Sequence, residues 1–157
     1  MFNREIGKSI VVEDEGTTQV SSAGTFDFVG TGVTVTGDGD NVTVTINGIQ
    51  KNEVTGTSQN ASVNNSYTCN NVALVTVTLP STAAVGDIVR IVGKGSGGWK
   101  LAQNASQTIY FGSDTTTTGT SGSLASTHRR DCVTVECVTA NTDWVVTDSQ
   151  AGSITVA

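Results

Sequence analysis

Histidine and cysteine are the first residues to consider for chemistry, because a thiol beside an imidazole can act as a nucleophile. The chain has one histidine, His128, and two of its three cysteines, Cys132 and Cys137, follow closely. No nucleophile motif surrounds His128, whose next neighbours are Arg129 and Arg130. The pattern predicts an exposed histidine in a loop leading to a strand, and packed, unreactive cysteines.

The cysteines Cys69, Cys132 and Cys137 are odd in number, so they cannot all pair within one chain. On a regular strand, positions 132 and 137 point to opposite faces, which disfavours a bridge between them. We expect all three thiols to be reduced, which is typical of proteins in the cytoplasm. Charged residues among the first eight predict that the chain has no secretory leader.

Gly93, Gly95 and Gly98 match the G-x-G-x-x-G pattern of dinucleotide-binding sites. Such a site needs a helix after the glycines, because the N-terminus of that helix holds the pyrophosphate. Here the residues that follow, 99–102, read as a strand. We therefore expect a glycine-rich hairpin turn and no nucleotide cofactor.

Asp38, Asp40 and Asn41 carry oxygen ligands of the kind that Ca²⁺ prefers. An EF-hand loop requires Gly at its sixth position and Glu at its twelfth, where this sequence has Thr43 and Ile49. The three residues lie between two alternating runs, so they predict a hairpin loop rather than a metal site.

Glycoside cleavage needs two converging carboxylates, and any two of the 14 acidic residues could meet in a fold. Most of them lie in turns or near the N-terminus, as solvated side chains do. Trp99, Trp144, Tyr67 and Tyr110 could stack on sugars, but their strand contexts favour packing in the core. We expect that this protein is not an enzyme.

The composition predicts the elements that position these residues. Threonine (26), valine (22) and glycine (18) dominate, and only 36% of the chain is hydrophobic. β-Branched residues suit strands and glycine suits turns, so helical bundles, coiled coils and doubly wound α/β folds are excluded. No apolar run approaches the roughly 20 residues of a membrane span. A net charge of −6 with scattered basic residues argues against nucleic acid as a partner.

Alternating residues predict a β-hairpin over residues 33–46, with Val33, Val35, Val42, Val44 and Ile46 on one face. Residues 10–12 and 25–28, the latter with Phe26 and Phe28, predict short strands. Residues 49–66 lose this periodicity and are rich in Asn, Ser and Thr, which predicts a linker.

Further short strands follow at regular spacing, without helical periods between them. Their approximate positions are 72–79, 88–92, 99–103, 107–111, 132–138, 143–147 and 153–156. We predict an all-β chain: an N-terminal extended arm and β-hairpin segment (1–48), the linker (49–66), and a small antiparallel β-sandwich or jelly-roll-like domain (67–157). The expected core residues are Val72, Leu74 or Val75, Val77, Leu79, Ile88, Ile91, Ile109, Val133, Val135 and Trp144.

Two stretches resemble segments of known proteins. Residues 13–17 (EDEGT) and 24–36 (GTFDFVGTGVTVT), with the hairpin to Ile46, resemble a segment of tail fibres and other accessory virion proteins of tailed bacteriophages. From Tyr67 to Val156 the chain is similar to a small C-terminal β-domain at phage fibre tips and on virion surfaces. Its landmarks are LPSTAAVGD (79–87), GGWKLAQN (97–104), QTIYFG (107–112) and NTDWV (141–145).

The resemblance implies a non-enzymatic homotrimer of the virion, with an N-terminal attachment segment and an outward C-terminal domain. Only about 60 residues precede that domain, and fully extended they would span at most about 200 Å. This shortness favours a cement or decoration protein bound to the major capsid protein or another virion protein. The alternative is a short tail-fibre protein that recognises a host surface glycan or protein, and a carbohydrate-active enzyme or lectin module is a third hypothesis.

We expect attachment to reside in the N-terminal segment. Its alternation can pair as an added strand, and its acidic run can select a basic partner surface. The alternative is a strand that completes the protein's own sheet. The candidate capsid-attachment residues are Phe2, Arg4, Ile6, Lys8, Ile10, Val12, Glu13, Asp14 and Glu15.

Overall fold

The protein is described by a computed structural model that covers residues 10–14, 17–23, 33–38, 41–46 and 48–157. Every regular element in these ranges is a β-strand, so the all-β prediction is confirmed. None of the described residues belongs to a helix long and apolar enough to cross a membrane. The chain divides into two compact units, Met1–Asn47 and Gly48–Ala157.

The described strands of the N-terminal unit form two separate two-stranded antiparallel sheets. Strands β1 (Ile10–Asp14) and β2 (Thr17–Ala23) form the first, and β3 (Val33–Asp38) and β4 (Asn41–Ile46) form the second. The second is the predicted hairpin, with Val33 opposite Ile46 and Val35 opposite Val44. These cross-strand partners share one face, as predicted. The strand predicted around Phe26 and Phe28 lies outside the described residues.

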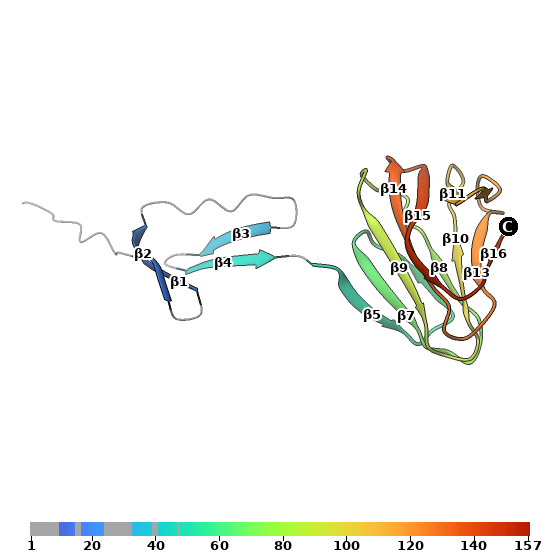
Figure 1. Cartoon of the computed structure of the whole chain (residues 1–157), viewed down its shortest axis with the longest axis horizontal. Coiled ribbons are helices and arrows are strands. Elements are labelled where there is room, and N and C mark those ends of the chain that lie inside the picture. The colour runs from blue at the N-terminus through green and yellow to red at the C-terminus, as the bar shows by residue number, and fades with distance from the viewer. Residues whose placement is uncertain (1–9, 15–16, 24–32, 39–40, 47) are drawn as a thin grey trace, which may run out of the picture. The chain divides into compact units, whose positions relative to one another are not determined.

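The C-terminal unit contains two mixed sheets that face each other (Figure 1). The seven-stranded sheet has the order β12-β11-β15-β14-β9-β7-β5, and the five-stranded sheet has the order β16-β13-β10-β8-β6. The strands are β5 (Gln50–Val54), β6 (Ser58–Asn60), β7 (Asn65–Cys69), β8 (Val75–Thr78), β9 (Ile88–Gly93), β10 (Trp99–Ala102), β11 (Thr108–Phe111), β12 (Asp114–Thr115), β13 (Ser123–Ser126), β14 (Cys132–Thr139), β15 (Asp143–Ala151) and β16 (Ile154–Val156).

From β5 to β10 the chain alternates between the two sheets. β5, β7 and β9 are parallel neighbours in one sheet, and β6, β8 and β10 are parallel neighbours in the other. The predicted antiparallel pairing is therefore wrong for these strands, although the two facing sheets form a sandwich. Parallel strands need a crossover connection, and here a strand of the opposite sheet makes that crossover, so no helix is required. The antiparallel pairs lie farther along, as in β14 with β9 and β15.

The predicted linker is also wrong over much of its length, because β5, β6 and the first residues of β7 lie within residues 49–66. β5 pairs with β7, and β6 pairs with β8. Four of the five residues of β5 are exposed and only Val54 is buried. This exposure of an outer strand explains the weak hydrophobic periodicity.

One core lies between the two sheets and is built from both of them. Of the predicted core residues, Val75, Val77, Leu79, Ile91, Ile109, Val133, Val135 and Trp144 are buried. Val72 is wrong, because it lies in the turn before β8 and is 86% exposed. Of the alternatives Leu74 and Val75, the structure buries Val75 and leaves Leu74 48% exposed. Ile88 is only half-buried, since Val89 and Ile91 are the inward residues of β9.

Candidate functional site

The predicted attachment residues lie only partly within the described structure. Ile10, Val12, Glu13 and Asp14 belong to β1, which pairs with β2 of the same chain. This part of the segment therefore has a partner strand of its own, in a sheet separate from those of the C-terminal unit. The other five, Phe2, Arg4, Ile6, Lys8 and Glu15, lie outside the described residues.

Apolar side chains of the second N-terminal sheet are exposed. Val35 of β3 is 48% exposed and Ile46 of β4 is 77% exposed. An isolated two-stranded sheet is only marginally stable in water, because it buries little apolar surface. The described strands of this unit thus form a structure that gains stability when another surface covers it.

The glycine-rich motif forms a tightly packed turn between β9 and β10. A Cβ atom added at Gly95 would lie 2.2 Å from the backbone oxygen of Asn71, and one at Gly93 would lie 2.2 Å from that of Arg129. Gly98 has a positive φ of 70°. Because β10 follows and no helix does, the motif is a turn, as predicted, but it is not a hairpin, since β9 and β10 belong to different sheets.

This turn joins two others into one surface at one end of the C-terminal unit. The backbone N–H of Lys94 donates to the carbonyl oxygen of Cys69 (2.9 Å), and that of Gly97 donates to Asn71 (3.0 Å). On its other side, the N–H of Gly93 donates to the carbonyl oxygen of Asp131 (3.0 Å). Six of the exposed side chains of these turns, which we call the turn surface, are Val72, Leu74, Lys94, His128, Arg129 and Arg130.

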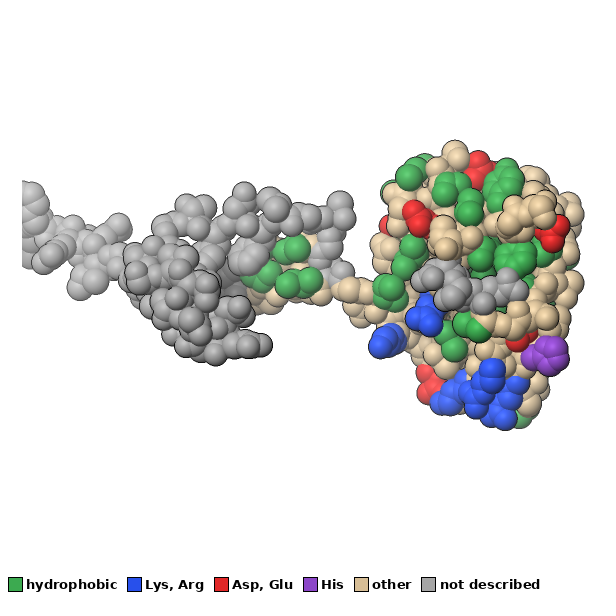
Figure 2. Space-filling view, in the orientation of Figure 1, with side chains coloured by type: hydrophobic (Ala, Val, Ile, Leu, Met, Phe, Trp, Pro, Cys, Tyr) green, Lys and Arg blue, Asp and Glu red, His purple; other side chains and the backbone are tan. Residues whose placement is uncertain are grey.

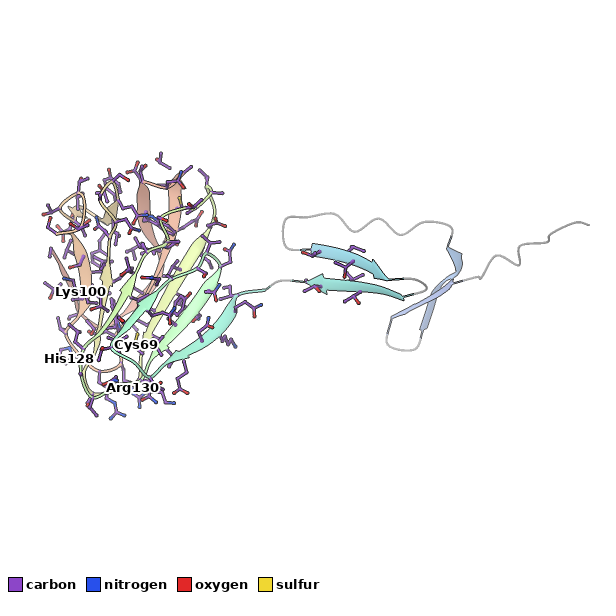
Figure 3. The ribbon with its side chains drawn as sticks, turned by 180° about the vertical axis from the view of Figure 1, so that it is seen from behind. Cys69, Lys100, His128 and Arg130 are labelled. Atoms are coloured by element: carbon purple, nitrogen blue, oxygen red, sulfur yellow. The ribbon has the colours of Figure 1, made fainter. Side chains whose placement is uncertain are left out.

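Basic side chains concentrate at this end. Figure 2 shows Lys and Arg gathered at one end of the C-terminal unit, and Figure 3 places His128 and Arg130 there. The Lys94 Nζ lies 2.5 Å from Glu53 Oε1, and Arg129 Nε donates to the carbonyl oxygen of Lys94 (2.7 Å). Lys94 and the amide of Asn70 hold the pKa of the Glu53 carboxyl below its ordinary value. Arg129 and Arg130 therefore supply most of the cationic character that remains available.

A buried carboxylate fixes the loop that carries the two arginines. Asp131 is 3% exposed, and its Oδ2 accepts hydrogen bonds from the backbone N–H groups of Thr127 and His128, both at 2.8 Å. Its carbonyl oxygen accepts a hydrogen bond from Trp99 Nε1 (2.7 Å). The turn surface is therefore presented by an ordered loop, which lowers the entropic cost of binding a partner.

The structure does not bring a catalytic thiol–imidazole pair together from His128 and Cys137. His128 Nδ1 lies 2.8 Å from Thr127 Oγ1, whereas Cys137 Sγ lies 3.2 Å from the carbonyl oxygen of Thr139, at the opposite end of β14. Burial raises the pKa of Cys137, and it raises the pKa of Cys69 to about 11. Both thiols are thus protonated and weakly nucleophilic at neutral pH.

The other candidates for chemistry also take structural positions. Asp38 and Asn41 face each other as the last partners of the β3–β4 pair. Within the part of the chain that the structure describes, no group of His, Cys, Asp or Glu side chains could hold a metal ion. Trp99, Trp144 and Tyr67 are buried in the core, as predicted, while Tyr110 is 39% exposed.

Sequence reasoning missed the turn surface because it assigned Val72 and Leu74 to a strand. A local signal was present in Asn71, whose Oδ1 accepts a hydrogen bond from the N–H of Ala73 (2.8 Å). Asn side chains favour such turns, which place the following residues outside the sheet. Comparisons with protein-family models and with curated proteins found no match for this chain.

Proposed function

We propose that this protein is a non-enzymatic structural protein of a phage virion, bound to the capsid surface as a cement or decoration protein. It acts as a homotrimer, assembles in the host cytoplasm, and contacts the major capsid protein or another virion protein through its N-terminal segment. Neither nucleic acid nor a membrane is a partner, and the function requires no cofactor.

The observation that carries this proposal is the construction of the N-terminal unit. Its described strands form two separate two-stranded sheets with exposed Val35 and Ile46, whereas the C-terminal unit has its own core. A segment that is marginal alone and apolar on its surface is suited to binding a partner that covers it. The candidate attachment residues, Phe2 to Glu15, belong to this unit.

The turn surface supports the same function from the other unit. A cement protein must contact more than one subunit, so it needs more than one contact region. Exposed Val72 and Leu74 beside Arg129 and Arg130 suit a second contact, with an acidic, partly apolar protein surface. Because the protein binds the assembled shell and not the separated subunits, its binding free energy adds to the stability of the shell.

Deletion of residues 1–12 tests the attachment role. We expect the C-terminal unit to remain folded and retention on capsids of the producing phage to be lost, as measured by co-sedimentation. The thermal unfolding of the truncated chain is the control for folding. If the truncated chain co-sediments like the full chain, the N-terminal segment is not the anchor.

Immunogold labelling of purified particles tests the location. We expect label over the capsid surface. Label confined to the tail tip would instead favour the short tail-fibre alternative, with a host surface glycan or protein as the ligand.

A further inference from the structure

A groove of about 460 Å³ lies where three parallel strands of the five-stranded sheet end. Asn60 is the last residue of β6, Thr78 is the last residue of β8, and Asn104 follows β10 by two positions. This end of the unit is opposite to the turn surface, which lies at the start of β8 and β10. The residues that line the groove are Asn60, Ala61, Ser62, Val63, Thr78, Leu79, Pro80, Ser81, Thr82 and Asn104.

The lining of this groove includes parts of two copies of the same tetrapeptide: residues 60–62 of the first copy and Asn104 of the second. The sequence Gln-Asn-Ala-Ser occurs at residues 59–62 and again at 103–106. The first copy ends β6 and the second follows β10, and these strands pair with β8 on its two sides. The fold thus places the asparagine amide of Asn60 on one side of Leu79 and Pro80 and that of Asn104 on the other side.

The floor of the groove is fixed by backbone and side-chain hydrogen bonds. The N–H of Ala61 donates to the carbonyl oxygen of Thr78 (2.8 Å), and the N–H of Leu79 donates to Ala102 (2.9 Å). The Nδ2 of Asn104 donates to the carbonyl oxygen of Leu79 (2.8 Å) and to Oε1 of the buried Gln107 (3.1 Å). Both hydrogens of this amide are committed, so the Asn104 side chain can offer a ligand only an acceptor, its Oδ1.

The opposite wall offers a second amide that is free to bind. Asn60 is exposed, and its side chain makes no hydrogen bond to any described residue. The hydrogen bond that the Gln59 side chain donates to Asn60 ends on its backbone oxygen. Ser62, Ser81 and Thr82, which carry hydroxyls and are exposed, line the same groove. The groove therefore combines donors and acceptors at its rim with Ala61 and Leu79, which are buried at its base.

No charged side chain lines the groove, which excludes selection of an anion or a cation by charge. Amides and hydroxyls around an apolar floor match a sugar ring, which presents hydroxyls at its edge and C–H groups on its faces. The volume falls within the range of about 300–1,000 Å³ that is common for small-molecule sites. We propose that this groove binds a short neutral saccharide, with the amides of Asn60 and Asn104 hydrogen-bonded to its hydroxyls.

This proposal goes beyond the structural role and does not depend on where the protein sits on a virion. Its test uses the full chain, labelled with ¹⁵N, and a panel of probes: glucose, galactose, mannose, N-acetylglucosamine, lactose and maltose, with glucuronate and sialic acid as charged counterparts. At about 10 mM probe, a site with a dissociation constant near 1 mM, or about −4 kcal/mol, is mostly occupied. We expect at least one neutral sugar to shift the backbone amide signals of Asn60, Ser62, Ser81 and Thr82.

Two variants with different effects on the groove assign the signal to it. Asn60→Ala removes the free amide, and we expect binding to weaken by at least tenfold. Ser81→Trp fills the groove from an exposed position, and we expect it to abolish binding. Ser96→Ala, which removes an exposed polar side chain in the turn between β9 and β10, is the matched control and should bind like the unchanged chain.

The outcomes separate this proposal from the proposed function. Retention of Asn60→Ala and Ser81→Trp on capsids reports on attachment alone, so either idea can fail without the other. The saccharide site is wrong if none of the neutral sugars shifts these signals, or if Ser81→Trp binds as the unchanged chain does. Preference for the charged counterparts, or binding of an unstructured peptide in place of every sugar, also overturns it.

Discussion

The glycines of the turn between β9 and β10 are set by contacts with neighbouring backbone. At Gly95, a Cβ atom would meet the backbone oxygen and nitrogen of Asn71 at 2.2 and 2.3 Å. These atoms belong to the adjacent turn, so neither turn can move without disturbing the other turn. This close approach, and not a ligand, accounts for the nucleotide-like spacing of the motif.

Gly95→Ala should therefore destabilise the protein by about 2 kcal/mol or more, since overpacking against fixed backbone is costly. The measurement is urea unfolding of the full chain, followed by tryptophan fluorescence. Gly56→Ala is the control, because a Cβ atom at Gly56 meets nothing within 4 Å. It should change the free energy of unfolding by no more than about 0.5 kcal/mol. Equal stability of the two variants would contradict the packing account.

At the scale of elements, the burial of residues in β5 and in the turn before β8 is the opposite of what local hydrophobicity suggests. Val54 lies in a polar stretch and is 5% exposed, whereas Val72 lies in an apolar run and is 86% exposed. The difference arises because β5 pairs with β7 and turns Val54 into the core, while Val72 lies outside any strand.

Substitution of each of these two valines by Asp tests whether Val54 is buried and Val72 is exposed. Val54→Asp buries an unpaired carboxylate and should cost about 3 kcal/mol or more of unfolding free energy. Val72→Asp leaves its carboxylate in water and should be nearly neutral. Thermal unfolding by circular dichroism measures both. A stable Val54→Asp variant would mean that residues 49–66 are a linker after all, and a strongly destabilised Val72→Asp variant would return Val72 to the core.

Strand positions were predictable from the sequence where hydrophobic and polar residues alternate, but β7 and β13, which also bury side chains, were missed. Alternation in β8, β9, β14 and the first half of β15 reflects the two-residue period of strands, and the structure confirms these elements. Alternation identifies the buried face of a strand but not its neighbour. The parallel pairing of β7 with β9, separated by a strand of the other sheet, therefore left no local trace.

The closeness of the two asparagines of the candidate groove could not be predicted from the sequence either. Asn60 and Asn104 are far apart in sequence, and only the pairing of β6 and β10 with β8 brings them to one groove. The repeated tetrapeptide around them was readable, but its meaning depends on which strands are neighbours. The turn surface was hidden for the same reason, because it joins three turns from separate parts of the chain.

At the scale of the whole molecule, the two units differ in how far they bury their apolar side chains. The C-terminal unit buries two tryptophans completely, whereas Val35 and Ile46 of the N-terminal unit remain exposed. Symmetric association is a common way to cover such a surface. The proposed function expects three protomers.

Light scattering of the full chain should give three times the protomer mass of 16.1 kDa. Ile46→Asp, which places a charge on the 77% exposed position of β4, should lower that mass. Val85→Asp is the matched control, since Val85 is 67% exposed in the C-terminal unit. A mass of one or two protomers for the unchanged chain would contradict the trimer.

The alternation of the chain between sheets gives the C-terminal unit an extensible architecture. Each passage through both sheets adds one parallel strand to each, so Val54 pairs with Cys69 and Cys69 with Gly93 in successive layers. β5 and β6 are the outermost members of this series in their sheets. A further layer inserted ahead of Gln50 would meet the same pairing pattern that β5 offers to β7. An engineered variant can thus extend both sheets, layer by layer, beside β5 and β6.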